Sequence, residues 1–195
     1  KVGIVENNVQ CDVASDKDIR DKFNIIKRNF DRYEKGFLEK INLRYVVLCQ
    51  NLRVSNIKTA GVPNHNVKTL IVDIKSDERY FERSLHHELF HMVDDSYDSL
   101  FSDEKWSQLN NPNFKYAKCS TCSNRLDLTL YKDTKGFLTE YSMSTASEDM
   151  AEIFSFLMID KTKVSKILLK DPVINNKINF LKDELTKIDD NFKFE

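Results

Sequence analysis

Three of the four histidines in this 195-residue chain lie in the run His86-His87-Glu88-Leu89-Phe90-His91. His87 and His91 are four residues apart, so in a helix both imidazoles project from one face, a turn apart. Two neutral imidazoles at this spacing fit a borderline-soft ion such as zinc. Glu88 follows the first histidine directly, and its carboxylate could reach a water on the metal without binding the metal itself. The pattern predicts the metal-binding helix of a zinc-dependent peptidase.

Two further polar residues flank this motif. His86 is displaced from the histidine pair by one residue, and we do not expect it to bind the metal. We expect a partly exposed polar side chain there, and contact with substrate is the alternative. Asp94 comes three residues after His91. It could orient a histidine or face solvent, and the sequence leaves both open.

A catalytic zinc takes three protein ligands and a water, so one ligand must come from elsewhere in the chain. The metzincin motif would supply a glycine and a third histidine soon after His91, but Met92–Tyr97 contains neither. A better candidate is Glu148, which with Glu152 forms an i, i+4 pair on a predicted helix. Glu148 would bind the zinc. Glu152 would accept a hydrogen bond from the far nitrogen of a ligating histidine and fix its tautomer. This arrangement resembles that of the gluzincin peptidases.

The region around Glu148 also resembles the catalytic domain of anthrax lethal factor. There a tyrosine precedes the zinc-binding glutamate by seven residues, as Tyr141 precedes Glu148 here. More broadly, the chain resembles a family of bacterial zinc-binding metallopeptidases over roughly residues 40–160. The shared segments, in chain order, are Leu43–Cys49 (LRYVVLC), Ala60–Pro63 (AGVP), His86–Asp94 (HHELFHMVD) and Trp106–Tyr116.

The resemblance implies an endopeptidase that hydrolyses a peptide or protein substrate with one zinc ion held by His87, His91 and Glu148. Glu88 would take a proton from the attacking water and pass it to the leaving amine. Tyr141 would donate a hydrogen bond to the oxyanion, and packing as an aromatic ring is its alternative role. Two other functions stay open: a catalytically silent binding module with this fold, and an intracellular zinc hydrolase. The intact Glu88 argues against the first, and reduced cysteines would favour the second.

Composition argues against two kinds of partner. Lys and Arg number 30 against 31 Asp and Glu, a net charge of -1 that gives no electrostatic case for nucleic acid. No apolar run approaches the roughly 18 residues of a membrane span. We expect a monomer that acts on a peptide or protein substrate.

The four cysteines, Cys11, Cys49, Cys119 and Cys122, allow three complete pairings. For the C-x-x-C pair Cys119 and Cys122 we expect a disulfide that braces its loop, with free thiols as the alternative. A structural zinc would need two more ligands in a second pair of this kind. The even number favours an oxidising compartment, and so a secreted or exported protein.

The expected fold is one α+β domain over residues 1–195, with a small twisted sheet over the metal-binding helix. The resemblance implies that this is a zincin-like metallopeptidase fold. The sheet and a first helix would occupy about 1–75, with strands at Lys1–Val5, 43–49 and 67–74 and the helix at 16–33. We expect the last two strands to pair antiparallel across a turn at 60–66. The remaining segments are the metal-binding helix at about 77–95, an irregular wall or lid at 96–136, and helices at about 145–160, 162–169 and 174–188 within a helical C-terminal half at about 145–190.

Overall fold

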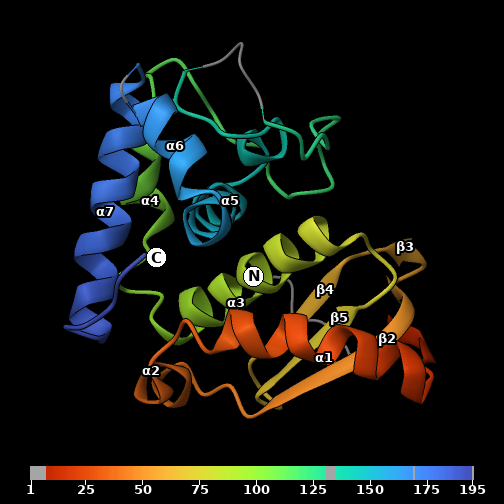
Figure 1. The fold of residues 1–195 in the computed structure, drawn as a ribbon. Coiled ribbons are helices and arrows are strands. Elements are labelled where there is room, and N and C mark those ends of the chain that lie inside the picture. The colour runs from red at the N-terminus through yellow and green to blue at the C-terminus, as the bar shows by residue number, and fades with distance from the viewer. Residues whose placement is uncertain (1–7, 131–134, 169, 195) are drawn as a thin grey trace. The chain divides into compact units, whose positions relative to one another are not determined.

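The computed structural model describes residues 8–130, 135–168 and 170–194, and the chain forms two compact units, residues 1–96 and 97–195 (Figure 1). Unit 1 combines a small sheet with helices, and the described part of unit 2 is helical with long irregular connections. The expected α+β class is therefore confirmed. Among the described helices, none is long and apolar enough to cross a membrane.

Unit 1 alternates short strands with three helices. Its described elements are β1 (Val9–Val13), α1 (Asp16–Phe30), α2 (Lys35–Lys40), β2 (Tyr45–Val54), β3 (Ile57–Lys58), β4 (Gly61–Asn64), β5 (Thr69–Asp73) and α3 (Glu78–Ser96). The strands lie in the order β1-β2-β5-β4, and β3 pairs with β2. The expected strand at Lys1–Val5 lies outside the described residues.

The expected antiparallel pairing of the two central strands is wrong. β2 and β5 run parallel, with Tyr45 opposite Thr69. The difference arises at 60–66, where we expected only a turn: Gly61–Asn64 forms β4, antiparallel to β5. The tight turn comes after it, at 65–68. The chain thus passes to the far side of β5 before it turns back. Pro63 suggested a turn, but proline is also tolerated on an edge strand such as β4.

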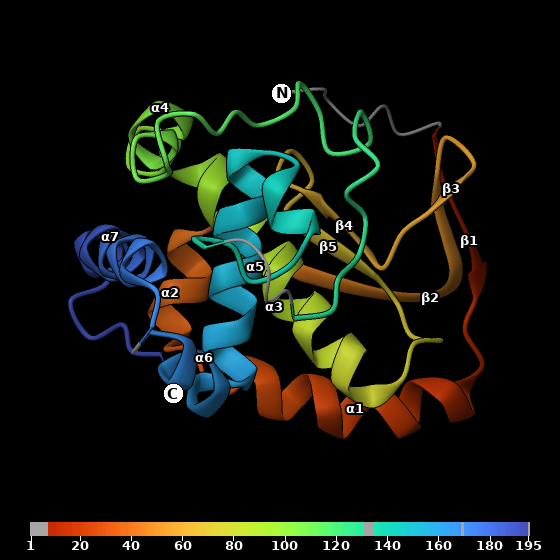
Figure 2. The ribbon, with the colours of Figure 1, turned by 90° about the horizontal axis from the view of Figure 1, so that it is seen from above.

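The helices α1 and α3 pack on the same face of the sheet (Figures 1 and 2). Buried side chains of α1, β5 and α3 form one apolar cluster that includes Ile25, Leu70, Val72, Phe81 and Leu85. Ile19, Ile26 and Phe30 of α1 are partly buried and pack against this cluster. As expected, α1 begins after Ser15, whose hydroxyl accepts a hydrogen bond from the backbone N–H of Asp18. This packing holds α3 against both α1 and the sheet.

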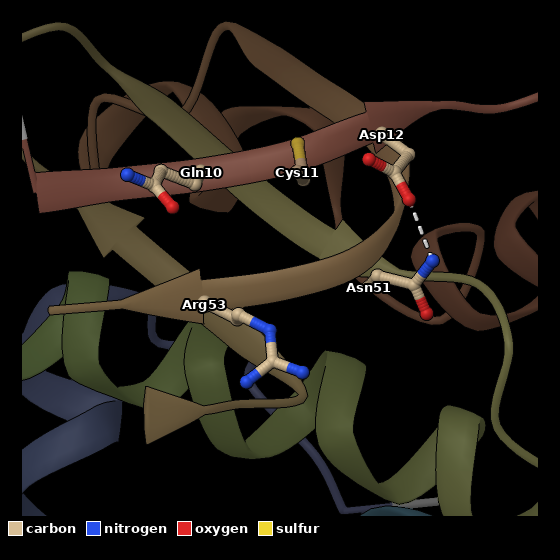
Figure 3. A pocket seen from close by; sticks show the side chains of 5 residues that line it. All are labelled: Gln10, Cys11, Asp12, Asn51 and Arg53. Atoms are coloured by element: carbon tan, nitrogen blue, oxygen red, sulfur yellow. Dashed lines mark hydrogen bonds between the residues drawn. The ribbon is translucent and has the colours of Figure 1, made fainter. Parts of the chain in front are cut away.

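A disulfide between Cys11 and Cys49 joins β1 to β2. The sequence did not indicate this pairing, because the two residues become neighbours only once β1 and β2 pair. Beside the disulfide is a pocket whose lining does not include the residues of the predicted zinc site (Figure 3). It is lined by Gln10, Cys11, Asp12, Asn51 and Arg53.

Unit 2 is built around α5. Its described elements are α4 (Asp103–Ser107), the 3-10 helix η2 (Tyr141–Met143), α5 (Ala146–Ile159), α6 (Lys161–Leu168) and α7 (Pro172–Ile188). The other helices contact α5, which is buried along most of its length. The three C-terminal helices were thus predicted to within about two residues. In its described part, the segment after α3 is irregular as expected up to residue 136, apart from α4.

Candidate metal centre

The helix α3 carries His87 and His91 one turn apart, as the sequence predicted. Their rings meet edge to face with centroids 4.9 Å apart, and their Nε2 atoms are 3.2 Å apart. Two ligands about 2.0–2.1 Å from a tetrahedral zinc ion are roughly 3.3 Å from each other. The two nitrogens are therefore spaced as neighbouring zinc ligands. A hydrogen bond between the rings would give the same distance.

Glu88 lies on α3 against the edge strand β4. A Cβ atom placed on Gly61 would be 2.5 Å from Cγ of Glu88 and 3.0 Å from its Cδ. The Glu88 stem therefore occupies the space that any larger residue at position 61 would fill. From the sequence, Gly61 was expected only as part of a turn. In the structure it lets α3 and β4 approach each other around the Glu88 side chain.

Glu148 lies in the first turn of α5, in unit 2. The hydroxyl of Thr145, the N-cap residue, accepts a hydrogen bond of 3.2 Å from the backbone N–H of Glu148. The pattern T-x-x-E at Thr145–Glu148 is a capping-box sequence, a local signal for the start of α5. A carboxylate in the first turn is favoured by the helix dipole. Glu152, one turn later, is buried.

The residue after Glu148 anchors α5 within unit 2. Asp149 is fully buried, and its Oδ2 accepts hydrogen bonds from Lys177 Nζ at 2.6 Å, the Tyr116 hydroxyl at 2.6 Å and Trp106 Nε1 at 2.9 Å. Burial raises the pKa of Asp149 and lowers that of Lys177, while their mutual attraction acts against both shifts. Three directional contacts on one oxygen hold the start of α5 in place.

Tyr141 begins η2 and is half-buried. Its backbone N–H donates to the carbonyl of Asp127 at 3.0 Å, and the Arg125 guanidinium donates to the carbonyl of Met143 at 3.2 Å. The irregular segment thus braces η2. Within that segment a disulfide joins Cys119 and Cys122, the pair for which we expected one.

The expectation of a partly exposed His86 is wrong, since its side chain is fully buried. Its Nδ1 lies 2.5 Å from the Tyr33 hydroxyl and its Nε2 lies 2.9 Å from Oδ1 of Asn29. Burial lowers the pKa of His86 to about 3, so the ring is neutral at ordinary pH. Asp94 is also buried, which disfavours the solvent-facing alternative for that residue.

Residues 51–189 match a family model described as "Putative zinc-binding metallo-peptidase". The chain belongs to this family. A crystal structure from Bacteroides caccae, which bears the same description, has a similar fold. It aligns with a TM-score of 0.61 and 17% identity, over 91% of this chain and 73% of that chain. A search of curated proteins gave no match.

Membership of this metallopeptidase family confirms the resemblance that the sequence motifs indicated, and it supports zinc binding and peptidase activity. The likeness to lethal factor is not shown by these matches. At 17% identity the crystal structure supports the fold alone. The assignments of individual residues to the zinc site therefore stay predictions, and the geometry described above is their support.

Proposed function

We propose that this protein is a zinc-dependent endopeptidase of the gluzincin type, with one zinc ion held by His87, His91 and Glu148. The observation that carries the proposal is the 3.2 Å separation of the two Nε2 atoms on α3 of a chain in a zinc-peptidase family. Each of the three residues offers one ligand atom, two imidazole nitrogens and a carboxylate oxygen. Two histidines and one carboxylate are a known ligand set for catalytic zinc.

When bound, zinc would lower the pKa of a coordinated water to about 7 and polarise the scissile carbonyl. Side chains of the protein carry out the proton transfer, stabilise the oxyanion and orient a zinc ligand. Glu88 takes a proton at its carboxylate from the attacking water and delivers it to the leaving amine. Tyr141 donates a hydrogen bond to the oxyanion as it forms. Glu152 accepts a hydrogen bond from a ligating histidine and fixes its tautomer.

The pairing of the cysteines is relevant to the cellular compartment in which the protein acts. All four of them, which lie in the described part of the chain, are paired in disulfides. Disulfides persist in oxidising environments and are rare where thiols are kept reduced. The two bonds therefore favour an exported peptidase over an intracellular hydrolase.

The test is cleavage of a mixed peptide library by the zinc-loaded protein, read by mass spectrometry, with Glu88→Ala beside it. The parent should cut peptides internally. Glu88→Ala should keep its zinc, measured by elemental analysis, and lose about 10²–10⁴ in rate. Cleavage by the variant at the parental rate would remove Glu88 from the mechanism. An inert, zinc-free parent would defeat the proposal as a whole.

A further inference from the structure

A line of polar residues connects α1 to α3, which we call the polar seam. It consists of Arg28, Asn29 and Tyr33 on the α1 side and Glu78, Glu82 and His86 on α3. The three α3 residues are spaced four apart, so they follow one side of that helix. At its exposed end Arg28 pairs with both glutamates, and such pairs contribute little. At its buried end stand Asn29 and His86.

The hydrogen bonds at the buried end define one arrangement of protons. The amide Nδ2 of Asn29 donates to the carbonyl of Ile25 at 2.8 Å and to Glu82 Oε1 at 3.0 Å. Its Oδ1 must therefore accept from His86, so Nε2 of His86 carries the proton. Nδ1 is then the acceptor for the Tyr33 hydroxyl. Each ring nitrogen of His86 thus has one role and one partner, both from the α1 side.

This arrangement fixes how α3 is rotated about its own axis. At about 100° per residue, His87 and His91 point roughly 100° and 140° away from the direction of His86. Their ring atoms lie on the order of 6 Å from the axis, so a rotation of about 10° moves them roughly 1 Å. Zinc–ligand distances tolerate only about 0.2 Å. Apolar packing is non-directional, whereas hydrogen bonds depend steeply on angle.

We propose that His86, through its hydrogen bonds to Asn29 and Tyr33, is a positioning residue that sets the rotation of α3 and so aims His87 and His91 at the metal. The inference rests on the proposed zinc site. It gives a reason for a fully buried, hydrogen-bonded histidine at a position where a leucine or phenylalanine would bury no polar nitrogens.

The test compares substitutions that keep or remove the polar contacts. His86→Phe keeps a ring but no donor or acceptor, His86→Gln keeps one of each, and Tyr33→Phe removes a single hydroxyl. Leu85→Ala, in the apolar cluster on the same helix, is the control for general destabilisation. For each protein we would measure zinc affinity by chelator competition, the visible absorption spectrum of the Co²⁺ form, and the melting temperature.

His86→Phe should weaken zinc binding on the order of tenfold or more and shift the Co²⁺ bands. His86→Gln should restore most of the affinity, and Tyr33→Phe should fall between. Leu85→Ala should lower the melting temperature with little change in either metal property.

Equal zinc affinity and spectra for His86→Phe and Leu85→Ala at matched melting temperatures would overturn the positioning role alone. If His86→Phe does not fold, Tyr33→Phe against Leu85→Ala decides in the same way. A parent protein that binds no zinc would overturn the proposed function and this inference together.

Discussion

Substitution of Gly61 by alanine tests whether Glu88 must lie where the structure places it. The added Cβ would be 2.5 Å from Cγ, 3.0 Å from Cδ and 3.3 Å from Oε1 of Glu88. Carbon atoms in contact are normally about 3.5–4.0 Å apart, so Cγ has to move by roughly 1 Å. The backbone of β4 is held by its pairing with β5, where Gly61 is opposite Val72, so the side chain will yield.

A displacement of about 1 Å in a reacting group can cost about 10² in rate. That factor corresponds to roughly 2.7 kcal/mol in the activation free energy. Zinc content should not change, because Glu88 is not a proposed ligand. We therefore expect Gly61→Ala to be a folded, zinc-loaded protein with kcat reduced on the order of a hundredfold.

The assay is the hydrolysis rate of a peptide chosen from the library screen, with zinc content and melting temperature measured on the same samples. Gly36→Ala in α2 is the matched control, because a Cβ there meets no atom within 4 Å. It should cleave at the parental rate. Glu88→Asp shortens the side chain that the added methyl group would touch, so the two changes should be non-additive when combined. Gly61→Ala with the activity of the control would refute the reasoning.

Three further outcomes are expected. Lys177→Met leaves the Asp149 carboxylate buried without its cation and should lower the free energy of unfolding by about 3–5 kcal/mol. Adding Asp149→Asn should recover most of that loss, and urea titration of the single and double variants measures it. In zinc-free protein, the unfolded chain binds a proton at position 86 near pH 6.5 and the folded chain only near pH 3. The free energy of unfolding should therefore fall below pH 6.5, by up to about 1.4 kcal/mol per pH unit, and His86→Gln should remove that part of the slope in urea melts taken across this range. In chelator competition, Glu148→Ala should lose its zinc, whereas Glu152→Ala should lower zinc affinity only about 10–100-fold. If Glu152→Ala loses its zinc and Glu148→Ala does not, Glu152 is the ligand.

The helices could be predicted from the sequence because their signals are local. In α3 the acidic start, the apolar repeat and the two histidines all fall within 19 residues. The sheet was harder, since the direction of β5 depends on whether Gly61–Asn64 pairs with it or only turns. That choice is made by contacts across the sheet, which periodicity along the chain does not report.

The same distinction holds at the candidate site. Residue types and spacing were enough to predict three zinc ligands and a general base, without any knowledge of the fold. These are His87, His91 and Glu148, and Glu88. The partners of His86 come from 53 and 57 residues away. Their role is visible only once α1 packs on α3. The need for a glycine at position 61 is likewise a matter of the space left by a side chain on another element.

The bond between Cys11 and Cys49 has a consequence for a protein that we propose to be an endopeptidase. The chain between the two cysteines contains all of α1, including Arg28 and Asn29 of the polar seam, and all of α2. If the enzyme cuts its own backbone within that loop, the two pieces stay covalently joined and α1 need not leave α3. Autolysis in this loop would leave a single band on a non-reducing gel. Two fragments would appear only after the disulfide is reduced.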